Sequence, residues 1–189
     1  KIAPGYGQWS KRERMDGVIV DRVLHFVPRR PTLVPRAVAE VSFGLRQAFV
    51  RWGEPAAIVA ASPALLSSAI VRLRALATHR ETPFVVWVQD LYGLGVVETG
   101  QGGGLAARAL RAMEAWLLRS ASTVVVIHDR FRAQVIDHLR VAPERVEVVR
   151  NWTHLSVDHV ADVDSTRRQL GWRSDEIVVL HSGNMGLKQ

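Results

Sequence analysis

The sequence contains no cysteine, which excludes disulfide bonds, a thiol nucleophile and a cysteine-ligated metal site. Its apolar runs all fall short of the about 18 residues that a membrane-spanning helix requires. The patterns HExxH, GxSxG and GxxxxGKS/T are also missing, so no motif indicates a zinc protease, a serine hydrolase or a P-loop protein. The chain starts with lysine rather than methionine and carries no signal peptide, and we expect its natural N-terminus to lie upstream.

The composition is typical of a folded α/β protein, with 48% hydrophobic and 23% charged residues. The formal net charge is +7. This excess charge has two interpretations: an anionic partner such as nucleotide phosphates, membrane lipid or nucleic acid, or a proteome that is rich in arginine throughout. Few of the arginines cluster in runs, so the composition leaves both interpretations open.

Apolar segments of strand length alternate with amphipathic segments of helix length along most of the chain. The first 14 residues are polar and are predicted to form a loop, followed by a turn at Asp16-Gly17. The predicted strands are 18–27, 57–61, 84–88, 123–127 and 146–149. The predicted helices are 36–52, 62–79, 105–119, 128–139 and 166–172. This alternation predicts an α/β fold, a Rossmann-like parallel sheet with helices on both faces.

Polar residues follow four of the predicted strands. They are Ser62, Gln89-Asp90, His128-Asp129 and Asn151. Because ligands of such sheets bind at the carboxyl ends of the strands, these residues are predicted to line one wall of a cleft. Ser62 and His128 are also predicted to cap the helices that follow them, with Pro63 in the first turn. Asp90 and His128 are the candidate catalytic residues. The alternative for Asp90 is a helix or turn cap, and the alternative for His128 is that it only fills the rim of the sheet.

The predicted helix 36–52 has an unusually broad apolar side with arginines around it. Its main apolar face consists of Val38, Val41, Leu45, Ala48, Phe49 and Trp52. The nearby arginines are Arg29, Arg30, Arg36, Arg46 and Arg51. One interpretation is ordinary packing on the sheet. The other is contact with an anionic membrane leaflet, which would favour each arginine near the surface by about 1 kcal/mol.

The last part of the chain contains another transition from a strand to a loop. Ile177–Leu180 is apolar and is predicted to form a buried strand. The glycine-containing loop Gly183–Gly186 follows, with Lys188 just beyond it. Loop N–H groups and a lysine are a combination that holds phosphate. Residues 153–174 are therefore predicted to be a linker, and 175–189 the start of a second domain that is cut off as its ligand site begins.

Several motifs occur here in an order that is found in one enzyme family. They are Lys1-Ile-Ala-Pro-Gly-Tyr6, Asp16-Gly-Val18, Arg22-Val23, Ser42-Phe-Gly-Leu45, Ser62-Pro63, Val86 to Asp90, Asn151-Trp152 and Ser182-Gly-Asn-Met-Gly-Leu-Lys-Gln189. With them the chain resembles family 4 of the glycosyltransferases, and more narrowly it is similar to the WbuB-like enzymes of O-antigen, capsule and exopolysaccharide assembly. The resemblance covers essentially all 189 residues.

The resemblance implies a GT-B fold, in which two Rossmann-like domains enclose the active site. Residues 1–152 would be the acceptor-side domain without its first strand, 153–174 the interdomain linker, and 175–189 the beginning of the nucleotide-sugar domain. It implies a hexosyltransferase that is retaining and independent of metals and other cofactors, with a nucleotide-sugar donor and a lipid-linked or saccharide acceptor. It also implies a cytoplasmic location, with peripheral contact at the inner face of the membrane. The fragment would be inactive alone.

The same resemblance assigns roles to individual residues. Gly183, Asn184, Met185 and Gly186 would lie near the donor diphosphate, and Lys188 would be the phosphate-binding lysine. Asn151-Trp152 matches the interdomain hinge, and Asp90 lies in a loop that carries acceptor-side or catalytic groups. The chain departs from the family pattern at Asn184, where many members have arginine, and at His154, where aspartate is common.

Two other classes of function remain as alternatives. One is a basic module that binds membranes or nucleic acid without catalysis, although the tryptophans fall mostly at core or helix-face positions, which argues against nucleic acid. The other is an oxidoreductase that modifies sugar nucleotides. It would require a GxGxxG motif at its first strand, and the glycine run 100–104 lacks that strand-to-helix context.

Overall fold

The computed structural model describes residues 9–29, 32–91, 104–153 and 162–180. By their contacts the residues form two compact units, 1–150 and 151–189, and each is described here by itself.

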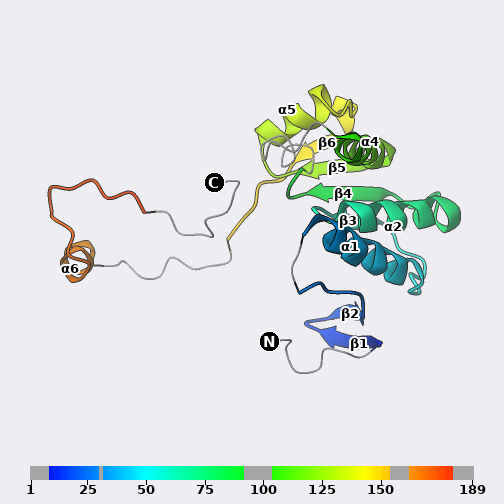
Figure 1. The fold of residues 1–189 in the computed structure, drawn as a ribbon, viewed down its shortest axis with the longest axis horizontal. Coiled ribbons are helices and arrows are strands. Elements are labelled where there is room, and N and C mark those ends of the chain that lie inside the picture. Colours follow the sequence, from blue (N-terminus) through cyan, green and yellow to red (C-terminus); the bar gives the residue numbers. More distant parts are fainter. Residues whose placement is uncertain (1–8, 30–31, 92–103, 154–161, 181–189) are drawn as a thin grey trace. The chain divides into compact units, whose positions relative to one another are not determined.

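The first unit is built on a parallel sheet of strands β3 (Ile58–Ala61), β4 (Phe84–Val88), β5 (Thr123–Val126) and β6 (Val146–Val148). The strands are hydrogen-bonded in the order β3-β4-β5-β6, and every neighbouring pair is parallel (Figure 1). The four strands follow the predicted ones within one residue at each end. The predicted fold class is therefore confirmed.

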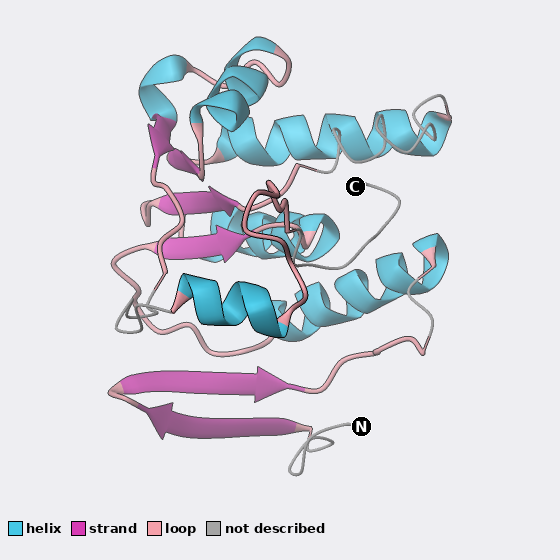
Figure 2. Ribbon diagram, turned by 90° about the vertical axis from the view of Figure 1, so that its left-hand side faces the viewer, coloured by secondary structure: helices cyan, strands magenta, loops and turns pink. Residues whose placement is uncertain are grey.

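Helices α1 (Leu33–Ala48), α2 (Leu65–Thr78) and α4 (Leu105–Ser120) lie side by side as a layer behind the sheet (Figure 2). Helix α5 (Asp129–Asp137) and the 3-10 turn η1 (Pro143–Arg145) connect β5 to β6. The core lies between sheet and helices, and its central side chains are Phe84, Val86, Val88, Val124 and Val126, all nearly or fully buried. Their neighbours Val85, Trp87 and Val125, which alternate with them along β4 and β5, are only half-buried.

The start of helix α1 differs from the prediction by three residues. The helix begins at Leu33 rather than at residue 36, so Pro35 lies within its first turn instead of in the preceding loop. Proline is tolerated there because the first N–H groups of a helix have no partner within it. The helix ends at Ala48, before the predicted end at residue 52. None of the described helices is both long enough and apolar enough to cross a membrane.

Helices α1 and α2 pack at a point where only glycine fits. A Cβ atom added to Gly44 would come within 2.7 Å of the Ser67 Cα atom. One turn earlier, the half-buried Glu40 extends from α1 to α2, and its Oε2 accepts a hydrogen bond of 3.0 Å from the Leu66 N–H. This carboxylate caps the positive N-terminal end of α2. The predicted cap was Ser62, and that prediction is wrong because α2 begins only at Leu65.

Removal of the Glu40 carboxylate is expected to destabilise the first unit. Glu40→Ala leaves the Leu66 N–H without its acceptor, and we expect a loss of about 1 kcal/mol in the free energy of unfolding. Glu40→Gln keeps an oxygen at the same place and should cost less. Chemical denaturation of the two variants measures the difference, and equal losses would mean that α2 does not need an acceptor at this position.

The N-terminal residues form a β-hairpin of β1 (Ser10–Met15) and β2 (Val18–Val23), and not the loop that was predicted up to residue 14. Asp16 and Gly17 have φ angles of 49° and 84° and form the two-residue turn. Cross-strand ion pairs replace apolar contacts: Arg12 donates two bonds of 2.7 Å to Asp21, and Arg22 contacts Glu13. The pattern of apolar residues could not reveal such a strand. Strand β2 also ends at Val23, short of the predicted residue 27.

These pairs lower the pKa values of the two carboxyl groups in the hairpin. The pKa of Glu13 is lowered by hydrogen bonds from Lys11 and Arg22, and that of Asp21 by the hydrogen bond from Arg12. A lowered pKa in the folded state means that the ionised form is favoured there. The pairs therefore support the hairpin at neutral pH, and this support is lost as the pH falls through the pKa values of the folded state.

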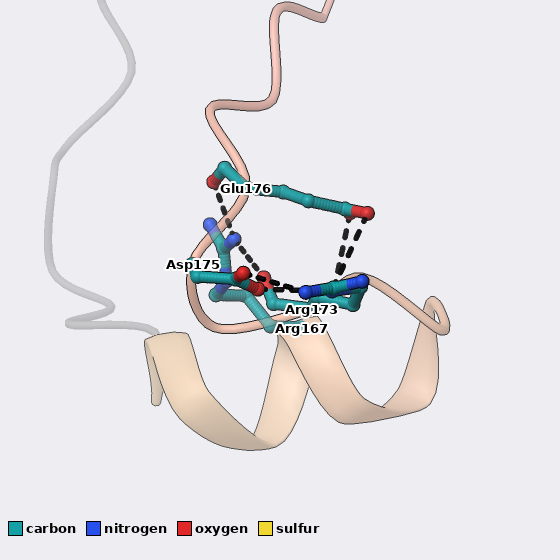
Figure 3. Close-up of polar contacts among 4 residues, drawn as sticks. All are labelled: Arg167, Arg173, Asp175 and Glu176. Atoms are coloured by element: carbon teal, nitrogen blue, oxygen red, sulfur yellow. Dashed lines mark hydrogen bonds and ion pairs between the residues drawn. The ribbon is translucent and has the colours of Figure 1, made fainter.

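The second unit contains helix α6 (Val163–Gln169), whose N-cap Asp162 accepts a 3.1 Å bond from the Ser165 N–H. After the helix the chain is held in a tight loop (Figure 3). The Arg167 guanidinium donates to the backbone oxygens of Arg173 and Glu176, and Arg173 pairs with Asp175 at 2.6 Å. This pair raises the pKa of Arg173 and lowers that of Asp175.

The apolar segment 177–180 is not the buried strand that was predicted. It lacks regular secondary structure, and the side chains of Ile177, Val179 and Leu180 are largely exposed. A strand requires a neighbour for its N–H and C=O groups, and the described residues of the second unit contain no strand that could pair with this segment.

Candidate functional site

Ser62 joins the carboxyl ends of β3 and β4. Its N–H donates to the Trp87 carbonyl at 2.9 Å, which extends the ladder between the two strands by one residue. Its hydroxyl donates to the Asp90 carbonyl at 2.9 Å and accepts from the N–H groups of Gln89 at 2.9 Å and Asp90 at 3.1 Å. One side chain directly after β3 thus fixes the backbone of the loop after β4.

Asp90 is held at this edge of the sheet with its side chain exposed. Its Oδ1 accepts a 2.9 Å bond from the Leu91 N–H, and the Leu91 side chain is buried in the core. Together with Ser62, this anchor restricts both the backbone and the carboxylate of Asp90. A fixed, solvent-accessible carboxylate at a strand end is suited to accept a hydrogen bond from a ligand hydroxyl. The structure therefore brings together three of the predicted residues of the cleft wall, Ser62, Gln89 and Asp90.

His128 follows β5 and is the N-cap of α5, as predicted. Its Nδ1 accepts a 3.1 Å bond from the Phe131 N–H, and its ring packs on the Phe131 ring with centroids 4.2 Å apart. Because Nδ1 acts as acceptor, the neutral ring carries its hydrogen on Nε2. Its catalytic role stays a prediction.

Substitution of His128 separates its capping role from any role in chemistry. His128→Ala removes the cap and is expected to lower the free energy of unfolding by about 0.5–2 kcal/mol. His128→Asn retains a side-chain acceptor at the N-cap and should restore most of this stability. If the imidazole also has the predicted catalytic role, the asparagine variant will be stable but will have a low turnover rate. Denaturation and steady-state rates of both variants distinguish the roles, and equal stability of the two would contradict the cap.

The remaining predicted residues near the sheet contribute differently. Asp129 forms an ion pair of 3.0 Å with Arg150, and because both side chains are about three-quarters exposed the pair contributes little stability. Asn151 and Trp152, the predicted hinge, belong to the second unit, and Trp152 is largely exposed. The predicted donor loop Gly183, Asn184, Met185, Gly186 and Lys188 lies outside the described residues, as does His154.

Glu114 was not among the residues predicted from the sequence. This carboxylate is buried on α4 and lines, with Ser62, Asp90 and Leu91, a small cavity of about 20 Å³. A buried carboxylate is costly unless it interacts with polar groups, so its place in the wall of the same cavity as Asp90 makes it part of the candidate site. The signal was present in the sequence: Glu114 occurs on the apolar face of its helix, four residues after Leu110 and three before Leu117. The described residues contain no group of three or more histidine, aspartate or glutamate side chains that could hold a metal ion.

Comparison with known proteins identifies the family. Residues 2–152 match the family described as Glycosyl transferase 4-like domain. The chain belongs to this family. The match covers the whole four-stranded sheet, the helices packed on it and the loops with Ser62, Asp90 and His128. The resemblance inferred from the motifs is thereby confirmed, and the first unit is the N-terminal domain of a family 4 glycosyltransferase fold.

A curated relative of this glycosyl transferase 4-like chain is WcaI of Escherichia coli (strain K12), a protein named as a glycosyl transferase of colanic acid biosynthesis. The two are 30% identical over 202 aligned residues, which cover all of this chain and 48% of the relative. The chain thus spans about half the length of the curated relative that it matches.

Proposed function

We propose that this chain is part of a glycosyltransferase that moves a sugar from a nucleotide-sugar donor to a lipid-linked or saccharide acceptor in the synthesis of a cell-surface polysaccharide. The observation that carries the proposal is the family match over residues 2–152. The similarity to a protein named for colanic acid biosynthesis supports the polysaccharide as the product.

In the proposed reaction, an acceptor hydroxyl forms a bond to the anomeric carbon of the sugar while the bond from that carbon to the diphosphate breaks. Negative charge builds up on the leaving diphosphate. Lys188 and the N–H groups of Gly183–Gly186 would stabilise this charge, which is the kind of interaction that contributes most to such transfers. The acceptor proton passes to an oxygen of the leaving phosphate. The reaction proceeds without a metal and retains the configuration at the anomeric carbon.

The acceptor would bind to residues 1–152, where Asp90 and His128 are at the carboxyl ends of β4 and β5. The restrained Asp90 carboxylate would accept a hydrogen bond from the acceptor, and the His128 Nε2–H would donate one. The proposed enzyme has two domains. The acceptor-side domain would be followed by the hinge Asn151-Trp152, the linker 153–174 and the donor domain, which begins at residue 175.

We propose that α1 places the enzyme at the membrane. Four apolar side chains one turn apart form a stripe along the helix, here called the α1 stripe. It consists of Val34, Val38, Val41 and Leu45, which are 69%, 49%, 37% and 47% exposed. Packing on the sheet does not account for side chains with this exposure. The arginines around the stripe, of which Arg29, Arg36 and Arg51 are exposed, complement anionic lipid. The enzyme would act in the cytoplasm, at the inner face of the membrane.

Binding of the donor tests the proposed function directly. A ligand that binds only the folded protein at 100 times its Kd stabilises the fold by about 2.7 kcal/mol. We therefore expect one nucleotide sugar, and its nucleoside diphosphate, to raise the unfolding temperature of the full natural polypeptide by a few degrees. If nucleotide sugars have no effect while DNA binds with a steep dependence on salt, the chain is a nucleic-acid module and the proposal is wrong.

A further inference from the structure

A polar cavity lies between the hairpin and the C-terminal end of α1. Its volume is about 350 Å³, near the lower end of the range of roughly 300–1,000 Å³ that small-ligand sites occupy. The charged residues of its described wall are four cations and one carboxylate, Lys11, Arg12, Arg22, Arg46 and Asp21. This space, here called the hairpin cavity, shares no lining residue with the small cavity beside Asp90.

The charges around the hairpin cavity do not balance. The ion pairs of the hairpin bring three cations, Lys11, Arg12 and Arg22, against two carboxylates. Arg46 adds a fourth cation, and it forms no ion pair with any residue that the structure describes. The cavity is therefore surrounded by two more positive than negative charges, and an anion is the kind of ligand that such surroundings favour.

Arg46 is held in the cavity wall by Trp9. Its Nη2 donates a 2.8 Å bond to the Trp9 carbonyl, and its guanidinium carbon lies 3.7 Å from the centroid of the Trp9 ring. The Arg46 Nε is buried and has no hydrogen-bond partner among the described residues. A buried donor on a charged group is costly without an acceptor, and an anionic oxygen in the cavity would supply one. Phosphate suits this side chain, because a guanidinium can donate two parallel bonds to its oxygens.

Two exposed aromatic side chains connect the hairpin cavity to the α1 stripe. Trp9 and Phe49 both line the cavity, and they are 68% and 83% exposed. Phe49 is the C-cap of α1 and follows Leu45, the last residue of the stripe, by about one helical turn. Tryptophan is enriched where a membrane meets water, and exposed apolar rings suit the same depth. A membrane that covers the stripe therefore places its lipid headgroups at the cavity.

We propose that the hairpin cavity binds the phosphate of an anionic phospholipid headgroup. Arg46 is the phosphate ligand, while the cations of the hairpin keep their carboxylate partners and contribute only their excess charge. Trp9 and Phe49 contact the glycerol and the first acyl carbons of the same lipid. The proposal rests on the membrane-facing stripe of the proposed function and does not depend on the transfer of a sugar. It adds recognition of one headgroup to a general attraction toward a negative surface.

Hydrogen exchange of the full natural polypeptide with vesicles tests the site without any enzymatic assay. We expect vesicles of phosphatidylglycerol and phosphatidylcholine to slow exchange both along the α1 stripe and in the segments 10–23 and 46–50, which border the cavity. Slower exchange along the stripe alone would overturn the headgroup site while leaving the stripe at the membrane. No change in either region would contradict the headgroup site and the stripe together.

Soluble probes distinguish a lipid headgroup from a free phosphate ion. Dihexanoylphosphatidylglycerol below its micelle-forming concentration presents the same phosphate with short acyl chains, and inorganic phosphate presents the anion alone. We expect the short-chain lipid to slow exchange in 10–23 and 46–50 and to bind at least about tenfold more tightly than inorganic phosphate, because it also contacts the two aromatic rings. Equal affinities would overturn the assignment to a lipid, and no binding of either probe would overturn the site.

A pair of arginine variants tests the role of Arg46 on the same vesicles. Arg46→Gln removes the phosphate ligand, and we expect at least about thirtyfold weaker binding. Arg51→Gln is the matched control, because it removes the same charge from an exposed position close to the end of α1 and should weaken binding by no more than about fivefold. Thermal unfolding of both variants shows whether the lost contact with Trp9 has also loosened the fold. Equal losses of binding in two folded variants would mean that only net charge matters, and would overturn the site.

Discussion

Replacing Lys188 by alanine in the full-length enzyme is expected to lower kcat by about 10²–10³-fold. The proposed chemistry places the largest change in charge on the leaving diphosphate, and a lysine directed at that charge acts mainly in the transition state. The unfolding temperature should change little, because the proposed role directs this lysine at a phosphate rather than into a packed core. Steady-state kinetics with the nucleotide sugar, together with thermal unfolding, measure both quantities.

Two further variants sharpen the experiment on Lys188. Lys188→Arg keeps the positive charge and should recover part of the rate, although arginine presents its donors in a different geometry. Lys11→Ala is the matched control, since Lys11 forms an ion pair with Glu13 at 2.7 Å in the hairpin and has no proposed role in the reaction. A Lys188→Ala enzyme with unchanged kinetics and normal affinity for the donor would remove this lysine from the mechanism.

Charged substitutions in the α1 stripe are expected to abolish binding to anionic vesicles. Full burial of one valine or leucine side chain contributes about 1.5–3 kcal/mol. The double variant Val38→Glu/Leu45→Glu removes two such contributions and adds two negative charges, so we expect at least about a hundredfold weaker binding. Co-sedimentation of the full-length protein with vesicles of phosphatidylglycerol and phosphatidylcholine measures the effect. Vesicles of phosphatidylcholine alone should bind the unchanged protein more weakly, because they lack the charge that attracts the arginines.

The matched control for the stripe is Leu73→Glu. Leu73 is an exposed apolar residue on α2, similar in size and exposure to Leu45. Its substitution adds one negative charge to a neighbouring helix, half of the change that the double variant makes, and should leave binding to vesicles nearly intact. If the stripe variant and the control lose binding equally, the interaction depends only on net charge. If neither loses binding, α1 is not the membrane-facing surface.

The parallel sheet could be predicted from the sequence because each of its strands is recognisable from the apolar pattern of its own residues. The run Phe84–Val88 is apolar at every position, which is typical of a central strand of a parallel sheet, and it forms β4. The capping role of His128 could be predicted for the same reason, since it depends on residues that are close in the sequence. The order of the strands then placed Ser62 and Asp90 at the same edge.

The hairpin and the contacts around the site could not be predicted, because they depend on residues far apart in the sequence. Strand β1 is stabilised by ion pairs such as Arg12 with Asp21, which the pattern of apolar residues does not reveal. Ser62 seemed a cap from its position before Pro63, yet its hydroxyl bonds to a loop 28 residues away, and Glu40 performs the capping. The segment 177–180 has the composition of a strand, but whether it forms one depends on a neighbouring strand, which the composition of the segment does not reveal.

The mass of the acceptor after reaction tests the proposed function most directly. The full-length protein would be incubated with a panel of nucleotide sugars and a lipid extract from the source membranes, and the lipids analysed by mass spectrometry. We expect one lipid-linked species to gain the mass of a single sugar residue, with one nucleoside diphosphate released for each product. An oxidised or epimerised nucleotide sugar, or no reaction with any donor while the protein is folded and binds the extract, would contradict the proposed function.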